Sequence, residues 1–326
     1  MLLTREEMWF DFGGAKLDPV ADRDAIAWAM NQFLYGEVTG IQIGHWLYQA
    51  PDLEAARFLS RQAVEEFQHV GNFVRILEML GKQPEPPHPV VRYLSTGAMP
   101  DDWAEHVAME MAIGEGLVLQ AFYAMIATID HPEIVSILER GVRQEERHVD
   151  FGEKRTIAAL RERPEIRKRL LGQALVTELA VRQLGKHMEK KLPQDHPVFR
   201  QIPAFVRHGL EMLERRMRLM GLVDRPLSEI GVASRAATIA QSFGEKAWAS
   251  LSAAPKRLFG LAKPTRLTDT YLSDPSIHDR LVASSLERGR GRASSRWRRS
   301  SPNGPSSRSR TRRPSSLSRA TASGCG

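Results

Sequence analysis

Two short segments of the sequence carry side chains that can bind a metal ion. Each holds a glutamate followed three residues later by a histidine: Glu66 with His69, and Glu145 with His148. On an α-helix, residues three apart lie on the same face, so each pair presents a carboxylate and an imidazole to one side. A single pair carries little information, because chance supplies it in many chains.

A third pair with the same spacing is excluded by its neighbours. Prolines flank and separate Glu85 and His88, in the run Gln-Pro-Glu-Pro-Pro-His-Pro. Proline in a helix interior removes a backbone hydrogen bond and clashes with the preceding turn. This segment is therefore predicted to be a loop, and its histidine is not counted as a ligand.

The other two pairs belong to an internal repeat. Glu37 lies 29 residues before Glu66, and Glu115 lies 30 residues before Glu145. Both of these lone glutamates directly follow a glycine. Because chemistry and spacing recur together, the sequence indicates two copies of one structural unit.

Long helical segments are predicted to position these residues. Apolar residues recur at steps of three and four, and proline and glycine mark the ends of each segment. Four helices are expected, at about residues 22–49, 52–80, 103–129 and 132–163. The ligand candidates lie near the middle of these helices, and the longest link joins the second to the third. The pattern predicts an all-α four-helix bundle with a polar middle.

Further helices and a basic tail follow. Two helices are expected at about 167–191 and 197–220, a weaker one at about 236–251, and a short basic amphipathic piece at 255–264. The expected organisation is an N-terminal lead-in at 1–20, the bundle at 21–165, accessory helices at 166–251 and a tail at 252–326. Much of the net charge of +7 lies in this tail, where Arg, Ser, Gly and Pro dominate, and we expect it to be disordered.

The repeated residues could hold two metal ions. Four glutamates and two histidines supply oxygen and nitrogen ligands that suit iron or manganese. The expected metal ligands are Glu37, Glu66, His69, Glu115, Glu145 and His148. We expect Glu66 and Glu145 to bridge the ions, Glu37 and His69 to serve one ion, and Glu115 and His148 to serve the other. The four glutamates are also the predicted catalytic residues.

Neighbouring glutamates do not have the spacing of the repeat. Glu65 stands four residues before its histidine and Glu146 two before, whereas both selected glutamates stand three before. Glu110 breaks the distance between the lone glutamate and the pair that follows it. These three glutamates are therefore not predicted to be ligands.

Composition limits the remaining chemistry. The only cysteine is Cys325, so a disulfide framework, a thiolate zinc site and a cysteine-ligated iron–sulfur cluster are excluded. No glycine-rich phosphate loop stands beside a strand pattern, so electrons are expected from a separate ferredoxin or reductase. No stretch approaches the uninterrupted apolar length that crosses a bilayer, and the N-terminus has no basic and apolar leader, which favours a cytoplasmic protein.

The six residues resemble the ligand set of the ferritin-like di-iron carboxylate superfamily, over about residues 20–165. The run 145–153, Glu-Glu-Arg-His-Val-Asp-Phe-Gly-Glu, is similar to the second motif of the aldehyde-deformylating oxygenases. The helices after Pro164 resemble those of larger oxidases, including the ribonucleotide reductase small subunit. The resemblance implies a ferritin-like four-helix bundle with additional C-terminal helices, two iron ions and dioxygen as co-substrate, with Mn/Fe as an open alternative.

Two positions depart from particular members of that superfamily. Phe73 stands where the reductase subunit carries its radical tyrosine, and Gly141 stands where the arylamine N-oxygenases carry a third histidine. Both differences argue against those two functions. Among the others, we expect an oxidase or oxygenase that uses dioxygen to oxidise a small or medium apolar organic substrate.

Two other functions stay open. The same site could oxidise ferrous iron for storage, although the added helices exceed what storage ferritins need. A tRNA-modifying hydroxylase would give the basic tail a use, since that tail could bind nucleic acid through counterion release, and deleting residues 286–326 would test this by RNA binding. An unselected tail without function, and a homodimer, also stay open.

Overall fold

The structure is a computed structural model, and it describes residues 1–97, 100 and 102–258. All of these residues belong to the first, Met1–Leu286, of the two units into which the chain divides. Every regular element among them is helical, and their one β-type contact is an isolated bridge between Leu17 and Ile129. The prediction of an all-α fold is confirmed for this part of the chain.

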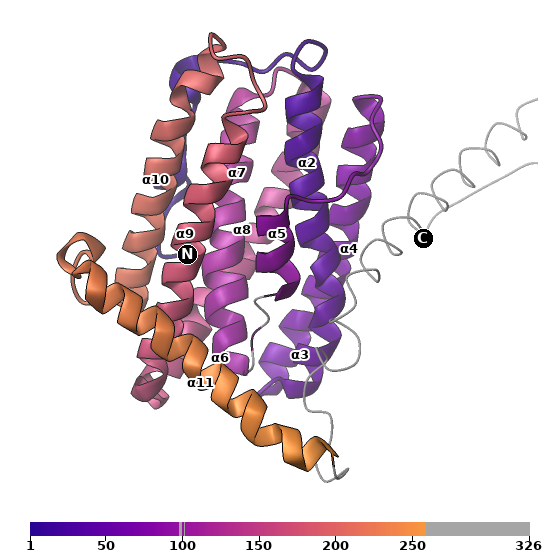
Figure 1. The fold of residues 1–326 in the computed structure, drawn as a ribbon. Coiled ribbons are helices and arrows are strands. Elements are labelled where there is room, and N and C mark those ends of the chain that lie inside the picture. The colour runs from indigo at the N-terminus through magenta and orange to yellow at the C-terminus, as the bar shows by residue number, and fades with distance from the viewer. Residues whose placement is uncertain (98–99, 101, 259–326) are drawn as a thin grey trace, which may run out of the picture. The chain divides into compact units, whose positions relative to one another are not determined.

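Long helices run alongside one another and carry the ligand candidates (Figure 1). These are α2 (Arg23–Val38), α4 (Leu53–Met79), the π-helix η4 (His106–Gly114) continued by α7 (Glu115–Thr128), and α8 (Pro132–Glu162). Within this group α2 packs on α4, and α8 packs on η4, α7 and α4. Each half of the sequence repeat therefore forms a pair of neighbouring helices.

Local signals mark both ends of α4 and the start of α8 at the predicted positions. The Asp52 carboxylate accepts a hydrogen bond of 2.7 Å from Ala55 N at the start of α4, and Gly81 takes a positive φ of 66° just beyond its end. His131 caps α8, and Pro132 is its first residue. The rejected histidine, His88, lies outside the long helices, where it caps the short helix α5 (Pro89–Arg92).

The predicted first helix, 22–49, is interrupted. α2 ends at Val38, a 3₁₀ turn η2 (Thr39–Gln42) follows, and α3 (Ile43–Gln49) resumes the helix. At Gly40 the chain comes so close to α4 that an added Cβ would lie 2.5 Å from the Cβ of Glu66. This contact between distant segments explains why helical periodicity alone missed the break.

The predicted third helix is also irregular. It begins as α6 (Trp103–Glu105), becomes the π-helix η4, and returns to α geometry at Glu115. π-Helical turns are rare and frequently occur at functional sites. Trp103–Thr128 is long and apolar enough to cross a membrane by length and composition, although Glu105, Glu110 and Glu115 interrupt its apolar residues. About 67% of its apolar window is buried, as in the core helix of a soluble protein.

Close helix contact also depends on Gly152 of α8. An added Cβ there would lie 2.6 Å from the Cβ of Met111 and 2.7 Å from the backbone nitrogen of Ala112. Both neighbours belong to η4, and one of them is backbone that cannot rotate away. The absence of a side chain at Gly152 therefore sets the distance between α8 and the π-helix.

The remaining elements surround these helices. The lead-in contains α1 (Arg5–Met8) and a 3₁₀ turn η1 (Phe12–Gly14), and it buries Leu3, Met8 and Phe12. The predicted helices after Pro164 are confirmed as α9 (Arg167–Met188) and α10 (Pro197–Met220). Short elements complete the list: η3 (Tyr93–Gly97), η5 (Pro164–Ile166) and η6 (Leu227–Glu229).

The last described helix continues past the residue at which the tail is predicted to begin. α11 (Val232–Leu258) packs on α9 and is longer than the expected helix at 236–251, so residues 252–258 are helical. Most of the amphipathic piece at 255–264 lies outside the described residues. The rest of the predicted tail after it lies wholly outside them. The predicted boundaries at residues 20, 165 and 251 are not tested and stay predictions.

Substitution of Gly152 tests the contact between α8 and η4. We expect Gly152→Ala to lower the free energy of unfolding by about 1–3 kcal/mol, because the methyl group would overlap the backbone of Ala112. Gly71→Ala is the matched control, since nothing lies within 4 Å of an added Cβ in the middle of α4. It should be neutral or stabilise by up to about 1 kcal/mol. Urea unfolding compares the two, and equal effects would contradict the assignment.

Candidate metal centre

The structure brings all six sequence-predicted ligands into one cluster. The cluster consists of Glu37 from α2, Glu66 and His69 from α4, Glu115 from α7, and Glu145 and His148 from α8. Five of them are at most 6% exposed, whereas the side chain of Glu115 is 22% exposed. Each residue lies on the face of its helix that points toward the cluster, as the spacing predicts.

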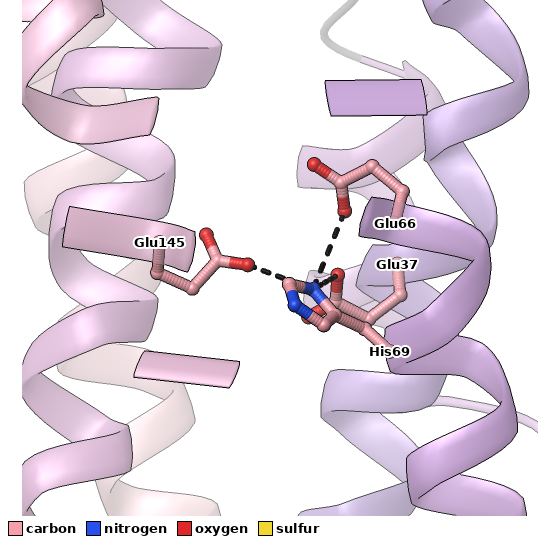
Figure 2. A group of neighbouring side chains, drawn as sticks. All are labelled: Glu37, Glu66, His69 and Glu145. Carbon is pink, nitrogen blue, oxygen red and sulfur yellow. Dashed lines mark hydrogen bonds and ion pairs between the residues drawn. The ribbon is translucent and has the colours of Figure 1, made fainter. Parts of the chain in front are cut away.

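Three carboxylates surround His69. Its Nδ1 lies 2.9 Å from Glu145 Oε1, 3.1 Å from Glu37 Oε2 and 3.9 Å from Glu66 Oε2. Figure 2 shows Glu145 reaching this imidazole from a helix on one side, and Glu37 and Glu66 from helices on the other. These four residues can offer ligand atoms within 4.8 Å of one another, which is close enough for one ion.

Three carboxylates also surround His148. Its Nδ1 lies 3.4 Å from Glu66 Oε1, 3.5 Å from Glu145 Oε2 and 4.0 Å from Glu115 Oε2. Glu66 and Glu145 therefore each turn one oxygen toward each histidine. This geometry is what the predicted bridging role of these two carboxylates requires.

Gln62 is a contact that the sequence reasoning missed. Its Nε2 donates to Glu66 Oε1 at 3.1 Å and to Glu115 Oε1 at 2.9 Å. It lies one helical turn before Glu66, on the same face of α4. That spacing was the available signal, and the amide holds the two carboxylates in register.

The outer nitrogens of both imidazoles also have partners. His148 Nε2 lies 2.9 Å from Glu65 Oε2, and His69 Nε2 lies 2.7 Å from Gln144 Oε1. Each partner directly precedes the glutamate of the other motif. Glu65 is thus placed outside the ligand set, as its spacing predicts, but its role as the partner of His148 was missed.

The two other excluded glutamates also face other groups. Glu146 accepts a hydrogen bond of 2.8 Å from the Tyr123 hydroxyl, and the Glu110 carboxylate accepts one of 2.5 Å from His106. Neither belongs to the groups of residues whose ligand atoms lie close enough to hold an ion. Selection by repeat spacing therefore separates the clustered glutamates from their neighbours.

Both histidines are strongly basic in the metal-free cluster. Burial by itself would lower the pKa of His69, but the charges of Glu37 and Glu145 outweigh it and raise the pKa to about 12. For His148 burial is again opposed, chiefly by Glu145, and the pKa rises to about 10. Without metal, both imidazoles therefore hold protons in the midst of carboxylates.

The carboxylates divide into two groups. Burial, together with the like charges of Glu37 and Glu145, raises the pKa of Glu66 and Glu115 well above the usual value. Burial alone would raise the pKa of Glu145, but His148 and His69 outweigh it and lower the pKa below its usual value. Burial is also outweighed at Glu65, where the hydrogen bond from His148 and then that from Arg61 lower the pKa to about 2. Without metal, the cluster therefore favours protonation of Glu66 and Glu115 and ionisation of Glu145 and Glu65.

The residues present fit a pair of divalent metal ions. Buried Glu115 Oε2 has no hydrogen-bond partner, and His148 Nδ1 has only ion pairs of 3.4 Å or longer, which is costly for groups out of contact with water. Four carboxylates carry the charge that two divalent ions would neutralise, while both imidazoles would bind as neutral ligands. A mixed glutamate and histidine set suits iron or manganese rather than calcium, which prefers oxygen ligands alone.

Comparisons of the chain with protein families, with curated proteins and with solved structures found no match. The arrangement of the six residues is therefore the basis for any functional assignment. What it establishes directly is a helical protein with a buried cluster of glutamate and histidine that could hold metal.

The raised pKa of His69 predicts a pH dependence of stability in the metal-free protein. Between pH 6.5 and 12 the folded protein keeps a proton on His69 that the unfolded chain has released. This stabilisation is complete below pH 6.5 and is lost as the pH rises toward 12, at about 1.4 kcal/mol per pH unit. Urea unfolding with a chelator, from pH 7 to 9, should therefore show a steeper loss in the wild type than in His69→Gln. Equal slopes would contradict the assignment.

Proposed function

We propose that this chain is a ferritin-like di-iron oxidase or oxygenase. It uses dioxygen and electrons from an external ferredoxin or reductase to oxidise a small or medium apolar organic molecule in the cytoplasm. The observation that carries this proposal is the position of Glu66 and Glu145, each with one oxygen toward His69 and the other toward His148. Two shared carboxylates between two histidines are the ligand arrangement of a dinuclear centre.

The helix arrangement supports the ferritin-like assignment. α2 and α4 supply one glutamate and one Glu-x-x-His pair, and α7 and α8 supply the second set. Di-iron and di-manganese carboxylate bundles take a glutamate from each of two helices and such a pair from each of the other two. α9, α10 and α11 are then the additional C-terminal helices.

The side chains of this protein would hold the ions and keep the site dry. A pair of ferrous ions would supply two electrons and adjacent open positions for dioxygen. His69 and His148 present Nδ1 to the site, while acceptors outside it hold Nε2–H and so fix the ring orientation. Gln62 keeps Glu66 and Glu115 in place, and burial of the other ligands limits access of water.

A small apolar cavity beside His69 supports an apolar co-substrate. It lies between α4, α7 and α8, and the residues that line it with His69 are Asn72, Phe73, Phe122, Ile137, Leu138 and Gly141. An added Cβ at Gly141 would lie 3.8 Å from His69 Nε2, in ordinary van der Waals contact with the edge of the imidazole. The cavity has room for about one small molecule, such as dioxygen, and not for the body of an organic substrate.

Metal stoichiometry is the first test of the proposed centre. Anaerobic loading with ferrous iron should give two ions per chain in the wild type and fewer in Glu145→Ala, because that change removes the carboxylate shared by both positions. Glu146→Ala is the matched control, since its side chain faces Tyr123 instead of the cluster. Elemental analysis after desalting measures the ions, and an optical band should form when oxygen is admitted. Equal iron in all three proteins would contradict the assignment.

Oxygen consumption separates substrate oxidation from iron storage. With excess ferrous iron and no other reductant, we expect oxygen uptake to stop once the two bound ions of each chain are oxidised. It should resume when a reductant and an apolar compound, such as a medium-chain aldehyde, are added. An oxygen electrode measures both phases. Continued oxidation of excess ferrous iron would instead favour the ferroxidase function.

A further inference from the structure

We propose that Glu65 and Gln144 set the affinities of the two metal positions separately, each through the histidine of the opposite motif, and make the two positions inequivalent. The inference rests on the proposed metal pair and adds the residues that distinguish its two halves. Both act on the metal through a histidine, so they are positioning residues and not ligands.

The contacts cross between two helices. Glu65 directly precedes Glu66 on α4, yet its Oε2 lies 2.9 Å from Nε2 of His148 on α8. Gln144 directly precedes Glu145 on α8, yet its Oε1 lies 2.7 Å from Nε2 of His69 on α4. Each helix therefore provides the outer hydrogen-bond acceptor for the histidine that its neighbour contributes.

The two acceptors differ in charge. Glu65 is an ionised carboxylate, because Oε1 also accepts from Arg61 Nε at 2.8 Å and from Arg147 Nη2 at 2.7 Å. Gln144 is a neutral amide, and its orientation is set by a hydrogen bond of 3.2 Å from its Nε2 to Gln68 Oε1. Hydrogen bonds to an ionised acceptor are about twice as strong as those between neutral groups.

This difference bears on the metal because the acceptor on one ring nitrogen changes the basicity of the other. The carboxylate of Glu65 makes His148 the stronger electron donor, and the amide of Gln144 leaves His69 the weaker one. Glu66 and Glu145 each turn one oxygen to each half, so both positions share these two carboxylates. Glu65 and Gln144 occupy equivalent positions in the two halves of the repeat, and they differ in charge.

The test isolates each metal position before changing its acceptor. Glu37→Ala removes a ligand of the His69 position and leaves the His148 position, and Glu115→Ala does the reverse. Each background is combined with the isosteric exchanges Glu65→Gln and Gln144→Glu. Anaerobic calorimetric titration with Fe²⁺ alone then measures one dissociation constant per protein, without any assay of activity.

A crossed response is expected. In the Glu37→Ala background, Glu65→Gln should weaken Fe²⁺ binding by about tenfold to hundredfold, and Gln144→Glu should leave it unchanged. In the Glu115→Ala background, Gln144→Glu should tighten binding by about tenfold or more, and Glu65→Gln should leave it unchanged. A residue that only stabilised the fold would shift both backgrounds alike, so equal shifts would overturn the inference.

A second measurement uses the intact site and so does not depend on ion binding by the backgrounds. In protein loaded with Co²⁺, the Nε2–H protons of His69 and His148 should give separate paramagnetically shifted NMR signals. Glu65→Gln should move one of them and Gln144→Glu the other. If either exchange moved both signals, this inference would be overturned while the proposed function would stand. If the wild-type protein bound neither Fe²⁺ nor Co²⁺, both the inference and the proposed function would be overturned.

Discussion

Burial of like charges is the constraint on which this structure depends. Four carboxylates belong to two overlapping groups, within each of which the ligand atoms lie within 4.8 Å of one another, and all but Glu115 are almost fully buried. Ionised groups out of water are costly unless opposite charge compensates them. In the metal-free protein, protons held by the two histidines and raised pKa values at Glu66 and Glu115 provide that compensation. Divalent metal ions would also supply positive charge, and the cluster could hold them.

The surrounding helices hold this cluster in place through close backbone contacts and buried ion pairs. Gly40 and Gly152 let neighbouring segments approach to distances that a side chain would forbid. One turn beyond His148, Glu153 pairs with Arg216 of α10 at 2.9 Å and accepts from Leu2 N at 2.6 Å, so the N-terminal segment and α10 both secure α8. Both charges of this pair are 1% exposed, and loss of either partner would leave the other buried and unpaired.

The internal repeat of the sequence explains which residues of the cluster could be predicted and which could not. Repeated spacing selects Glu66 and Glu145 over the adjacent Glu65 and Glu146, because helical periodicity relates each residue to a face of its own helix. Where the halves differ, as at Glu65 and Gln144, the repeat offers no guidance about the consequence. In the proposed metal pair, a symmetric set of ligands with different outer partners would make the two positions differ.

The sequence by itself determined the all-α class, the positions of the long helices after Pro51 and the six clustered residues, since helix ends and faces follow from local spacing and from proline, glycine and capping residues. Only the tertiary structure decided the break after Val38, the π-helix before Glu115, and the contacts of Gln62, Glu65 and Gln144. Those contacts join Gln62 to Glu115, Glu65 to His148 and Gln144 to His69, residues that are 53 to 83 positions apart in the chain. Helix packing decides which side chains these residues contact. The periodicity of 3.6 residues along one helix does not indicate which side chain of a neighbouring helix faces it.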